Sequence, residues 1–186
     1  MNQFDEMQTP IDGLKLIERA PVCDQRGFLE RLFCARELTS LMGARSIVQI
    51  NHTFTANQGV VRGLHYQHAP HAEMKLVTCL RGQIFDVAVD LRRGSPTFLQ
   101  WHAELLSSKN FRTLIVPEGC AHGFQTLTDE CELIYLHTAY YEPGAESGIS
   151  PLDPSLDIRW PLPITELSER DEKHPMICES FPGLVL

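Results

Sequence analysis

Four side chains that lie far apart in the sequence could together remove a proton from a carbon next to a carbonyl group. His65 lies in the run Arg-Gly-Leu-His-Tyr-Gln, and Lys75 follows ten residues later. His122 lies in Pro-Glu-Gly-Cys-Ala-His-Gly-Phe, and Asp171 lies near the end of the chain. An imidazole can take the proton, a carboxylate can orient that imidazole, and an ammonium can hold the enolate oxygen. The order and context of these residues carry the inference, because none of them is specific alone.

The composition predicts one globular domain, residues 1–186. The chain has 186 residues, of which 43% are hydrophobic and 22% are charged, and its net charge is −8. This acidic balance argues against nucleic acid as the main partner, since binding of a phosphate backbone needs a basic face. A phosphorylated small ligand is still compatible, because a few local Arg and Lys residues suffice to bind one.

The cysteines and the N-terminal residues predict a cytoplasmic protein. None of the six cysteines forms a Cys-x-x-Cys pair, and their scatter through apolar runs predicts buried thiols in a reducing compartment. The first residues lack a basic start followed by an apolar run, so no signal peptide is expected. No apolar stretch is long enough to span a bilayer, so no membrane partner is expected.

Short alternating or apolar runs predict a mostly β structure. Phe85, Val87, Val89 and Leu91 share one face of such a run, and Gly and Pro residues separate the runs. Many short strands with this punctuation indicate a sandwich or a barrel. The expected strands cover residues 46–54, 75–80, 83–91, 98–106, 112–116 and 132–141.

Helices are expected to be few and short. Residues 34–41 could form one helix, which Gly43 would end, and residues 164–172 could form another of a turn or two. Five prolines fall within residues 143–163, which predicts an irregular segment on the surface. We therefore expect a barrel core at about 46–141 and a C-terminal wrapping segment at about 142–186.

The residues around His65 set a condition on the backbone. In a regular strand, His65 and Gln67 share a face and Arg62 points the other way. A bulge at Gly63 would bring Arg62 to the face of His65. Taken alone, each candidate also has an ordinary structural interpretation: a hydrogen-bonded histidine, a solvated Lys75, or a core tyrosine at Tyr135.

The Pro-x-Gly-x-x-His arrangement that ends at His122 resembles the second motif of cupin barrels. The first cupin motif supplies His-x-His and a glutamate, and here it reads His65-x-Gln67 with Glu73 downstream. A metal site made of His65, Glu73 and His122 is an alternative, because two histidines and one carboxylate suit iron. Gln67 in place of the second histidine favours a site without metal.

The ordered set of motifs resembles the dTDP-4-dehydrorhamnose 3,5-epimerase family of nucleotide-sugar epimerases. This resemblance implies an all-β cupin jelly-roll barrel, a homodimer, and a mechanism without metal or cofactor. The matching segments are 24–28, 62–67, 85–92, 95–98, 116–124, 140–141 and 167–171.

The resemblance also implies roles for individual residues. His65 matches the base, Asp171 the carboxylate paired with it, Tyr135 the acid on the opposite face, and Lys75 the residue at the developing enolate. The residues expected to bind the nucleotide-diphosphate sugar are Arg26, Phe28, Arg31, Gln49, Asn51, Arg62, His122, Tyr140 and Arg170.

The expected activity is inversion of carbon 3, carbon 5 or both in a nucleotide-linked 4-keto-6-deoxy sugar. Arg31 stands where a carboxylate is expected, and Ile50, Leu136 and Arg170 also depart from the rhamnose-pathway pattern. A charge reversal at a binding position changes which ligand is accepted, so we expect a different deoxysugar substrate. The alternatives are a metal-dependent cupin, such as a dioxygenase or isomerase, and a non-catalytic sugar-binding cupin.

Overall fold

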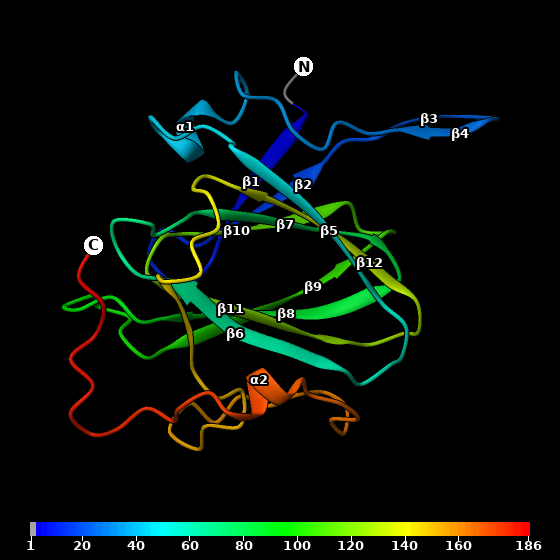
Figure 1. Cartoon of the computed structure of the whole chain (residues 1–186). Helices are drawn as coiled ribbons and strands as arrows, with labels where there is room; N and C mark the ends of the chain where they lie inside the picture. The colour runs from blue at the N-terminus through cyan, green and yellow to red at the C-terminus, as the bar shows by residue number, and fades with distance from the viewer. Residues whose placement is uncertain (1–2) are drawn as a thin grey trace.

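Two antiparallel β-sheets that face each other form the body of the molecule in the computed structural model, which describes residues 3–186 (Figure 1). The six-stranded sheet has the order β1 (Phe4–Gln8), β2 (Lys15–Arg19), β10 (Arg112–Val116), β7 (Lys75–Arg81), β12 (Cys131–His137), β5 (Gln49–Thr55). The five-stranded sheet has the order β13 (Glu146–Gly148), β6 (Val61–Gln67), β11 (Cys120–Thr126), β8 (Gln83–Asp90), β9 (Trp101–Ser107). These sheets confirm the all-β jelly-roll prediction.

Three layers of apolar side chains hold the sheets together. Between the sheets, residues such as Leu16, Leu114 and Phe124 form the barrel interior. The outer face of the six-stranded sheet packs against the short helix α1 (Thr39–Met42), where Leu38 and Met42 are buried. The outer face of the five-stranded sheet is covered by the C-terminal residues, which Figure 1 shows wrapping beneath it. Because the central strands are covered on both faces, strands such as β10 and β11 are buried along nearly their whole length.

The predicted strands largely form, with shifted ends. Those expected at 98–106 and 132–141 are observed as β9 and β12, which begin or end a few residues inside the prediction. The face shared by Phe85, Val87, Val89 and Leu91 exists, but it packs against the C-terminal segment and leaves the alternate residues of β8 pointing into the barrel. The helices are shorter than predicted: α1 has four residues, and α2 (Glu169–Glu172) has four.

Two glycines allow β6 and β11 to approach each other closely. A Cβ atom on Gly63 would lie 2.5 Å from the Cα of Gly123, and one on Gly123 would lie 2.6 Å from the carbonyl oxygen of Arg62. Gly63 also has φ of +127°, a conformation that other residues rarely adopt. The register shifts here, since His122 pairs with His65 while Phe124 pairs with Arg62. This irregularity meets the condition set by the sequence, and Arg62 and His65 both face the barrel interior.

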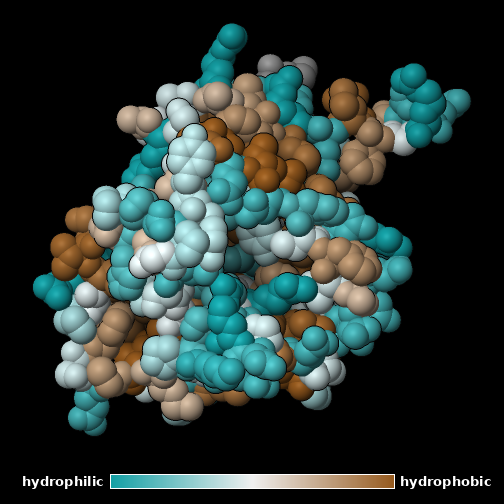
Figure 2. Space-filling model, viewed as in Figure 1, coloured by the Kyte–Doolittle hydropathy of each residue, from teal (hydrophilic) through white to brown (hydrophobic). Residues whose placement is uncertain are grey.

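A small hairpin, β3 (Val22–Asp24) and β4 (Gly27–Leu29), projects away from the barrel (Figure 1). Its apolar side chains are exposed, with Leu29 at 76% and Phe28 at 57%. Figure 2 shows further apolar surface between α1 and the base of this hairpin, where Figure 1 places the start of β5. Ile50 and Phe54 are the exposed large apolar residues within β5.

Two sequence expectations concern the cysteines and membrane spans. Cys79, Cys120 and Cys131 are buried free thiols as predicted, but Cys23 and Cys178 are exposed free thiols, contrary to the prediction. They differ because Cys23 lies on the projecting hairpin and Cys178 lies in the C-terminal wrap. Among residues 3–186, no helix is long and apolar enough to cross a membrane.

Candidate active site

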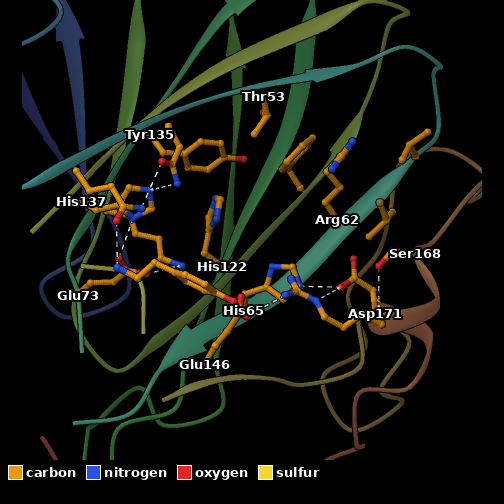
Figure 3. A pocket seen from close by; sticks show the side chains of 18 of the residues that line it. Thr53, Arg62, His65, Glu73, His122, Tyr135, His137, Glu146, Ser168 and Asp171 are labelled. Carbon is orange, nitrogen blue, oxygen red and sulfur yellow. Dashed lines mark hydrogen bonds and ion pairs between the residues drawn. The ribbon is translucent and has the colours of Figure 1, made fainter. Parts of the chain in front are cut away.

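A cavity of about 610 Å³ lies between the two sheets, and a short part of the C-terminal segment, residues 166–171, contributes to its lining. This volume is typical of a small-molecule site. Figure 2 shows its mouth as a hollow with a mainly hydrophilic rim, and Figure 3 shows the lining side chains. One wall comes from β5, β7 and β12, the opposite wall comes from β6 and β11, and α2 closes one side. The polar and charged lining residues are Gln49, Asn51, Thr53, Arg62, His65, Glu73, Lys75, His122, Tyr135, His137, Tyr141, Glu146, Glu166, Ser168, Arg170 and Asp171.

His65 and Asp171 form a histidine–carboxylate pair on one wall. His65 Nε2 lies 2.7 Å from Asp171 Oδ1, and the carboxylate is 2% exposed. The backbone N–H of Gly63 donates to the other carboxylate oxygen at 3.2 Å. Burial opposes ionisation of Asp171, but the hydrogen bond with His65 and the charge of that imidazole outweigh it and lower the Asp171 pKa. An ionised, fixed carboxylate is thus available to orient the imidazole.

The Leu-Ser-x-x-Asp motif explains how Asp171 reaches this position. Ser168 is the N-cap of α2, and its hydroxyl oxygen accepts from the Asp171 N–H at 3.1 Å. This side-chain cap satisfies a backbone donor at the first turn. A parallel bridge between Val60 and Glu166 ties the preceding residues to the start of β6. Asp171 is therefore anchored beside His65 by local capping and by pairing with the strand that carries the histidine.

Two further basic side chains surround this pair. Arg170 Nη2 lies 3.0 Å from His65 Nε2, and the His174 ring packs against the His65 ring in a T-shaped arrangement with centroids 5.4 Å apart. Nε2 of His65 cannot accept from Arg170 while it donates its own hydrogen to Asp171. The carboxylate only accepts, so we assign the hydrogen to Nε2. The free lone pair of the neutral imidazole then lies on Nδ1, which is the basic atom.

Tyr135 lies on β12 in the wall opposite His65 (Figure 3). Burial raises the pKa of its hydroxyl strongly, and the nearby charge of Asp86 raises it further. Its ring contacts two imidazoles: that of His122, in a T-shaped arrangement with centroids 5.9 Å apart, and that of His137, stacked with centroids 6.0 Å apart. A phenol in this setting holds its proton and is placed to act as an acid.

Lys75 belongs to a network that covers the same wall. Its Nζ lies 3.1 Å from Glu73, whose other carboxylate oxygen bonds Nδ1 of His137 at 2.8 Å. Burial opposes ionisation of Glu73, but the hydrogen bond from His137 and the charge of Lys75 together lower its pKa. Asn51 Nδ2 reaches His137 Nε2 at 3.4 Å. The ammonium is therefore held in place at the cavity surface and can stabilise a developing oxyanion.

His122 forms a second histidine–carboxylate pair, deeper in the barrel. Its Nε2 lies 2.8 Å from Asp86 Oδ1, and Asp86 is fully buried. Asp86 lies on β8 among apolar residues, on the face that points into the barrel. Burial raises the Asp86 pKa more than the attraction of His122 lowers it. This pair thus keeps a proton in the interior, adjacent to the cavity.

Most of the residues predicted from the sequence do line this cavity. The structure brings together His65, Asp171, Tyr135, Lys75, Arg62, Gln49, Asn51, His122 and Arg170. Tyr140 is absent from the lining, where its neighbour Tyr141 lies and donates to Glu146.

Three predicted binding residues lie outside the cavity of their own chain. Arg26 pairs with Asp24 on the hairpin, and Phe28 packs against Phe111. Arg31 pairs with Glu37. The expectation of an altered substrate assumed that Arg31 faces the site. Within the chain, Arg31 pairs with Glu37 and does not line the cavity, so this assumption is not met there.

Sequence reasoning missed Asp86, His137 and His174. A carboxylate inside an apolar strand, as at Asp86, is a signal that could have been read from the sequence, because an isolated buried charge is costly. His137 follows Tyr135 at the two-residue spacing of a shared strand face, which also could have been read. His174 gave no such signal, since its position beside His65 depends on how the C-terminal segment wraps.

The alternative metal site of His65, Glu73 and His122 is not assembled. Each of the three side chains bonds a different partner: Asp171, His137 and Asp86 respectively. Within the described residues, the grouping close enough to hold a metal ion is instead His65, Asp171 and His174, whose ligand atoms lie within 4.8 Å of one another.

A jelly roll whose cavity carries a histidine–carboxylate pair opposite a buried tyrosine defines a cupin-type enzyme built for proton transfer. Residues 8–179 match the sequence profile of dTDP-4-dehydrorhamnose 3,5-epimerase, and the chain belongs to this family of nucleotide-sugar epimerases. The chain is 46% identical over 176 residues to dTDP-4-dehydrorhamnose 3,5-epimerase of Pseudomonas aeruginosa, covering 92% of this chain and 96% of the relative.

Two other relatives differ in the reaction named for them. The crystal structure of a dTDP-6-deoxy-D-glucose-3,5-epimerase from Legionella pneumophila, in complex with dTDP-4-keto-L-rhamnose, superimposes with a TM-score of 0.90 at 40% identity. That match covers 98% of this chain and 99% of the other. A dTDP-4-dehydrorhamnose 3-epimerase from Streptomyces niveus is 38% identical and covers 91% of this chain and 82% of that protein.

Proposed function

We propose that this enzyme inverts carbons 3 and 5 of a dTDP-linked 4-keto-6-deoxyhexose. The observation that carries the proposal is the placement of the His65–Asp171 pair and Tyr135 on opposite walls of one cavity. The ketone acidifies the hydrogens on its neighbouring carbons. Nδ1 of His65 removes one of these hydrogens from one face, and the Tyr135 hydroxyl returns a proton to the other face, which inverts the carbon.

The remaining cavity residues support the charge that develops. As the C–H bond breaks, negative charge moves to the ketone oxygen, where the Lys75 ammonium is placed to hold it. Asp171 stabilises the imidazolium that forms on His65. Arg62 and Arg170 supply the positive charge that a diphosphate group requires, and Gln49, Asn51 and His122 supply hydrogen bonds to the sugar and phosphates.

Incubation in deuterated water with the dTDP-linked 4-keto-6-deoxyglucose, followed by mass spectrometry and NMR, tests this proposal. We expect two deuterons in the product, one at carbon 3 and one at carbon 5. His65→Asn should lower turnover about 10²–10⁴-fold, as removal of a general base usually does. The matched control is His102→Asn, because His102 also bonds a carboxylate at 2.9 Å but lies outside the cavity. Deuteration at carbon 3 alone would assign a 3-epimerase, and near-normal turnover in His65→Asn would remove the base assignment.

We also propose that the enzyme works as a homodimer in which the β3–β4 hairpin serves the partner's cavity. An isolated two-stranded hairpin is marginal in water, and this one exposes Val22, Phe28 and Leu29. A second copy would cover these side chains and bring Arg26 and Phe28 to a substrate site.

Mixed dimers test this arrangement. His65→Asn and Arg26→Ala chains should each be poorly active alone. After they are unfolded together and refolded, activity should return, because one site of the mixed dimer has an intact barrel and an intact hairpin. A monomer in analytical ultracentrifugation, or no recovery on mixing, would contradict the proposal.

A further inference from the structure

Each inversion leaves the two proton-transfer groups in the wrong state for the next one. This inference rests on the proposed function. After one inversion, His65 carries the proton taken from carbon, and Tyr135 has lost its own proton to the other face. One proton must leave His65 and one must reach Tyr135 before the site can act again. Because burial raises the Tyr135 pKa, the phenolate is driven to recover a proton, and a nearby donor would be used.

His122 lies between these two groups (Figure 3). On one side it is the direct cross-strand partner of His65, so the two side chains project from β11 and β6 toward the same face. Residues in this relation have Cβ atoms about 4.5–5.5 Å apart, within reach of direct or one-water proton transfer. On the other side, its ring packs against the Tyr135 ring in a T-shaped arrangement, with centroids 5.9 Å apart. His122 is therefore a neighbour of both the base, His65, and the acid, Tyr135.

Asp86 gives His122 the chemistry of a relay. One carboxylate oxygen bonds His122 Nε2 at 2.8 Å, and the other oxygen, Oδ2, is buried with no hydrogen-bond partner among residues 3–186. A buried polar atom without a partner is costly in a folded protein and calls for an explanation. If Asp86 binds and releases a proton, the free oxygen Oδ2 is the atom that can carry that proton. Burial favours the protonated form, and Asp86 is close enough to Tyr135 for its charge to affect that hydroxyl.

The other imidazole beside Tyr135 is less suited to this task. Both ring nitrogens of His137 have neighbours, since Nδ1 bonds Glu73 at 2.8 Å and Nε2 lies 3.4 Å from Asn51. Its ring stacks on the Tyr135 ring at an interplanar angle of 22°. Because the nitrogens of an imidazole bond within the ring plane, they do not point toward the phenol ring in this arrangement. Glu73 also holds Lys75, so a proton moved onto Glu73 would release that ammonium.

We propose that the His122–Asp86 pair is a proton relay that resets the enzyme by passing the proton from His65 to Tyr135. The pair gives one proton to the Tyr135 phenolate, which restores the phenol. It then receives one proton from the His65 imidazolium, directly or through one cavity water, which restores the neutral base. The pair begins and ends with the same number of protons, no covalent bond to the sugar is involved, and both catalytic groups return to their starting forms.

The relay allows both carbons to be inverted during one residence of the sugar. A reset through bulk water would require water to pass the bound sugar at the mouth of the cavity between the two inversions. An internal reset needs only the groups that already surround the bound sugar. Loss of the relay should therefore slow every inversion after the first, while the first proceeds from the resting enzyme, whose His65 and Tyr135 are already in the correct states.

Rapid-quench kinetics with enzyme in excess and then with substrate in excess test the relay. In Asp86→Asn, we expect the first inversion per active site to stay within about threefold of wild type. In His122→Gln, which also loses a contact to the bound sugar, we expect later inversions to slow at least tenfold more than the first. Later inversions should fall tenfold or more, and mono-epimerised sugar should accumulate. Added imidazole should restore the later phase and leave the first unchanged. Tyr135→Phe should lack the first phase, and His102→Asn should match wild type in both phases.

Two results would overturn the relay. One is an equal loss of the first and later phases in both variants, which would indicate a binding or structural role for His122. The other is unchanged steady-state turnover in both variants. The His122→Gln variant keeps the test valid if Asp86→Asn misfolds. It retains the buried Asp86 carboxylate, and the glutamine side-chain N–H can still donate a hydrogen bond to it. Absence of epimerisation by the wild-type enzyme would instead overturn the proposed function itself.

Discussion

Replacement of Asp171 by asparagine is the most informative single change at this site, because it removes a charge and preserves the shape. The carboxylate is 2% exposed and has two hydrogen-bond donors, His65 Nε2–H and the Gly63 N–H, one on each oxygen. With the nitrogen and oxygen 2.7 Å apart, the charges of imidazolium and carboxylate centre about 4 Å apart. At an effective dielectric constant of about 20, this attraction is about 4 kcal/mol, or about 10³-fold in rate.

The asparagine amide adds a second penalty. It has one acceptor oxygen for two donors, and its NH₂ group must face either Gly63 or His65. If the oxygen keeps the buried Gly63 N–H, the NH₂ group faces His65 Nε2 and forces the hydrogen onto Nδ1. Nδ1 then has no lone pair with which to accept a proton from carbon. The equivalent Asp→Asn change in a serine protease triad lowers kcat about 10⁴-fold for this reason. We therefore expect Asp171→Asn to lower kcat about 10³–10⁴-fold.

Two measurements distinguish this explanation from misfolding or weak binding. Solvent deuterium exchange and net epimerisation should fall together, and KM should stay within a few-fold, because Asp171 acts through His65. Glu169→Gln is the matched control, since it removes the same charge from the same helix at a side chain that is 91% exposed. Activity of Asp171→Asn within tenfold of wild type, with Glu169→Gln unchanged, would refute the reasoning.

Three further outcomes follow from the same geometry. Tyr135→Phe should lose epimerisation much more than solvent exchange, because His65 still removes protons; equal loss of both would point to a positioning role for Tyr135. Exhaustive chelation should leave activity unchanged, and activity that disappears with a chelator and returns with one metal would favour the metal-dependent alternative. Asp90 is buried, which opposes ionisation, but hydrogen bonds from Arg92, Ser95 and Thr97 lower its pKa to about 2 from its ordinary 3.8. Its stabilising contribution, on the order of 1–2 kcal/mol, is present above pH 4 and lost as the pH falls toward 2. Asp90→Asn should therefore flatten the loss of unfolding free energy over that interval, and an unchanged slope would contradict this assignment.

The sequence by itself determined the strands and the chemical groups. Alternation and Gly or Pro punctuation predicted β5, β7, β8, β9, β10 and β12, because side-chain direction in a strand depends only on its period of two. The identities of His65, Lys75, Tyr135 and Asp171 predicted proton transfer next to a carbonyl, because those functional groups are what the chemistry requires. The ordered motifs also predicted the family.

Tertiary structure decided which of these groups meet. The irregular pairing near Gly63 turns both Arg62 and His65 into the cavity. It is possible because Gly63 and Gly123 have no Cβ atoms, so the two backbones lie closer together than any other pair of residues would allow. The pairing of His122 with Asp86 depends on the register between β11 and β8, which no local pattern specifies. The hairpin that carries Arg26 and Phe28 points away from its own cavity, which only the arrangement of the folded chain reveals. Local propensity therefore defined the pieces, and long-range strand pairing, which depends on the whole chain, built the site.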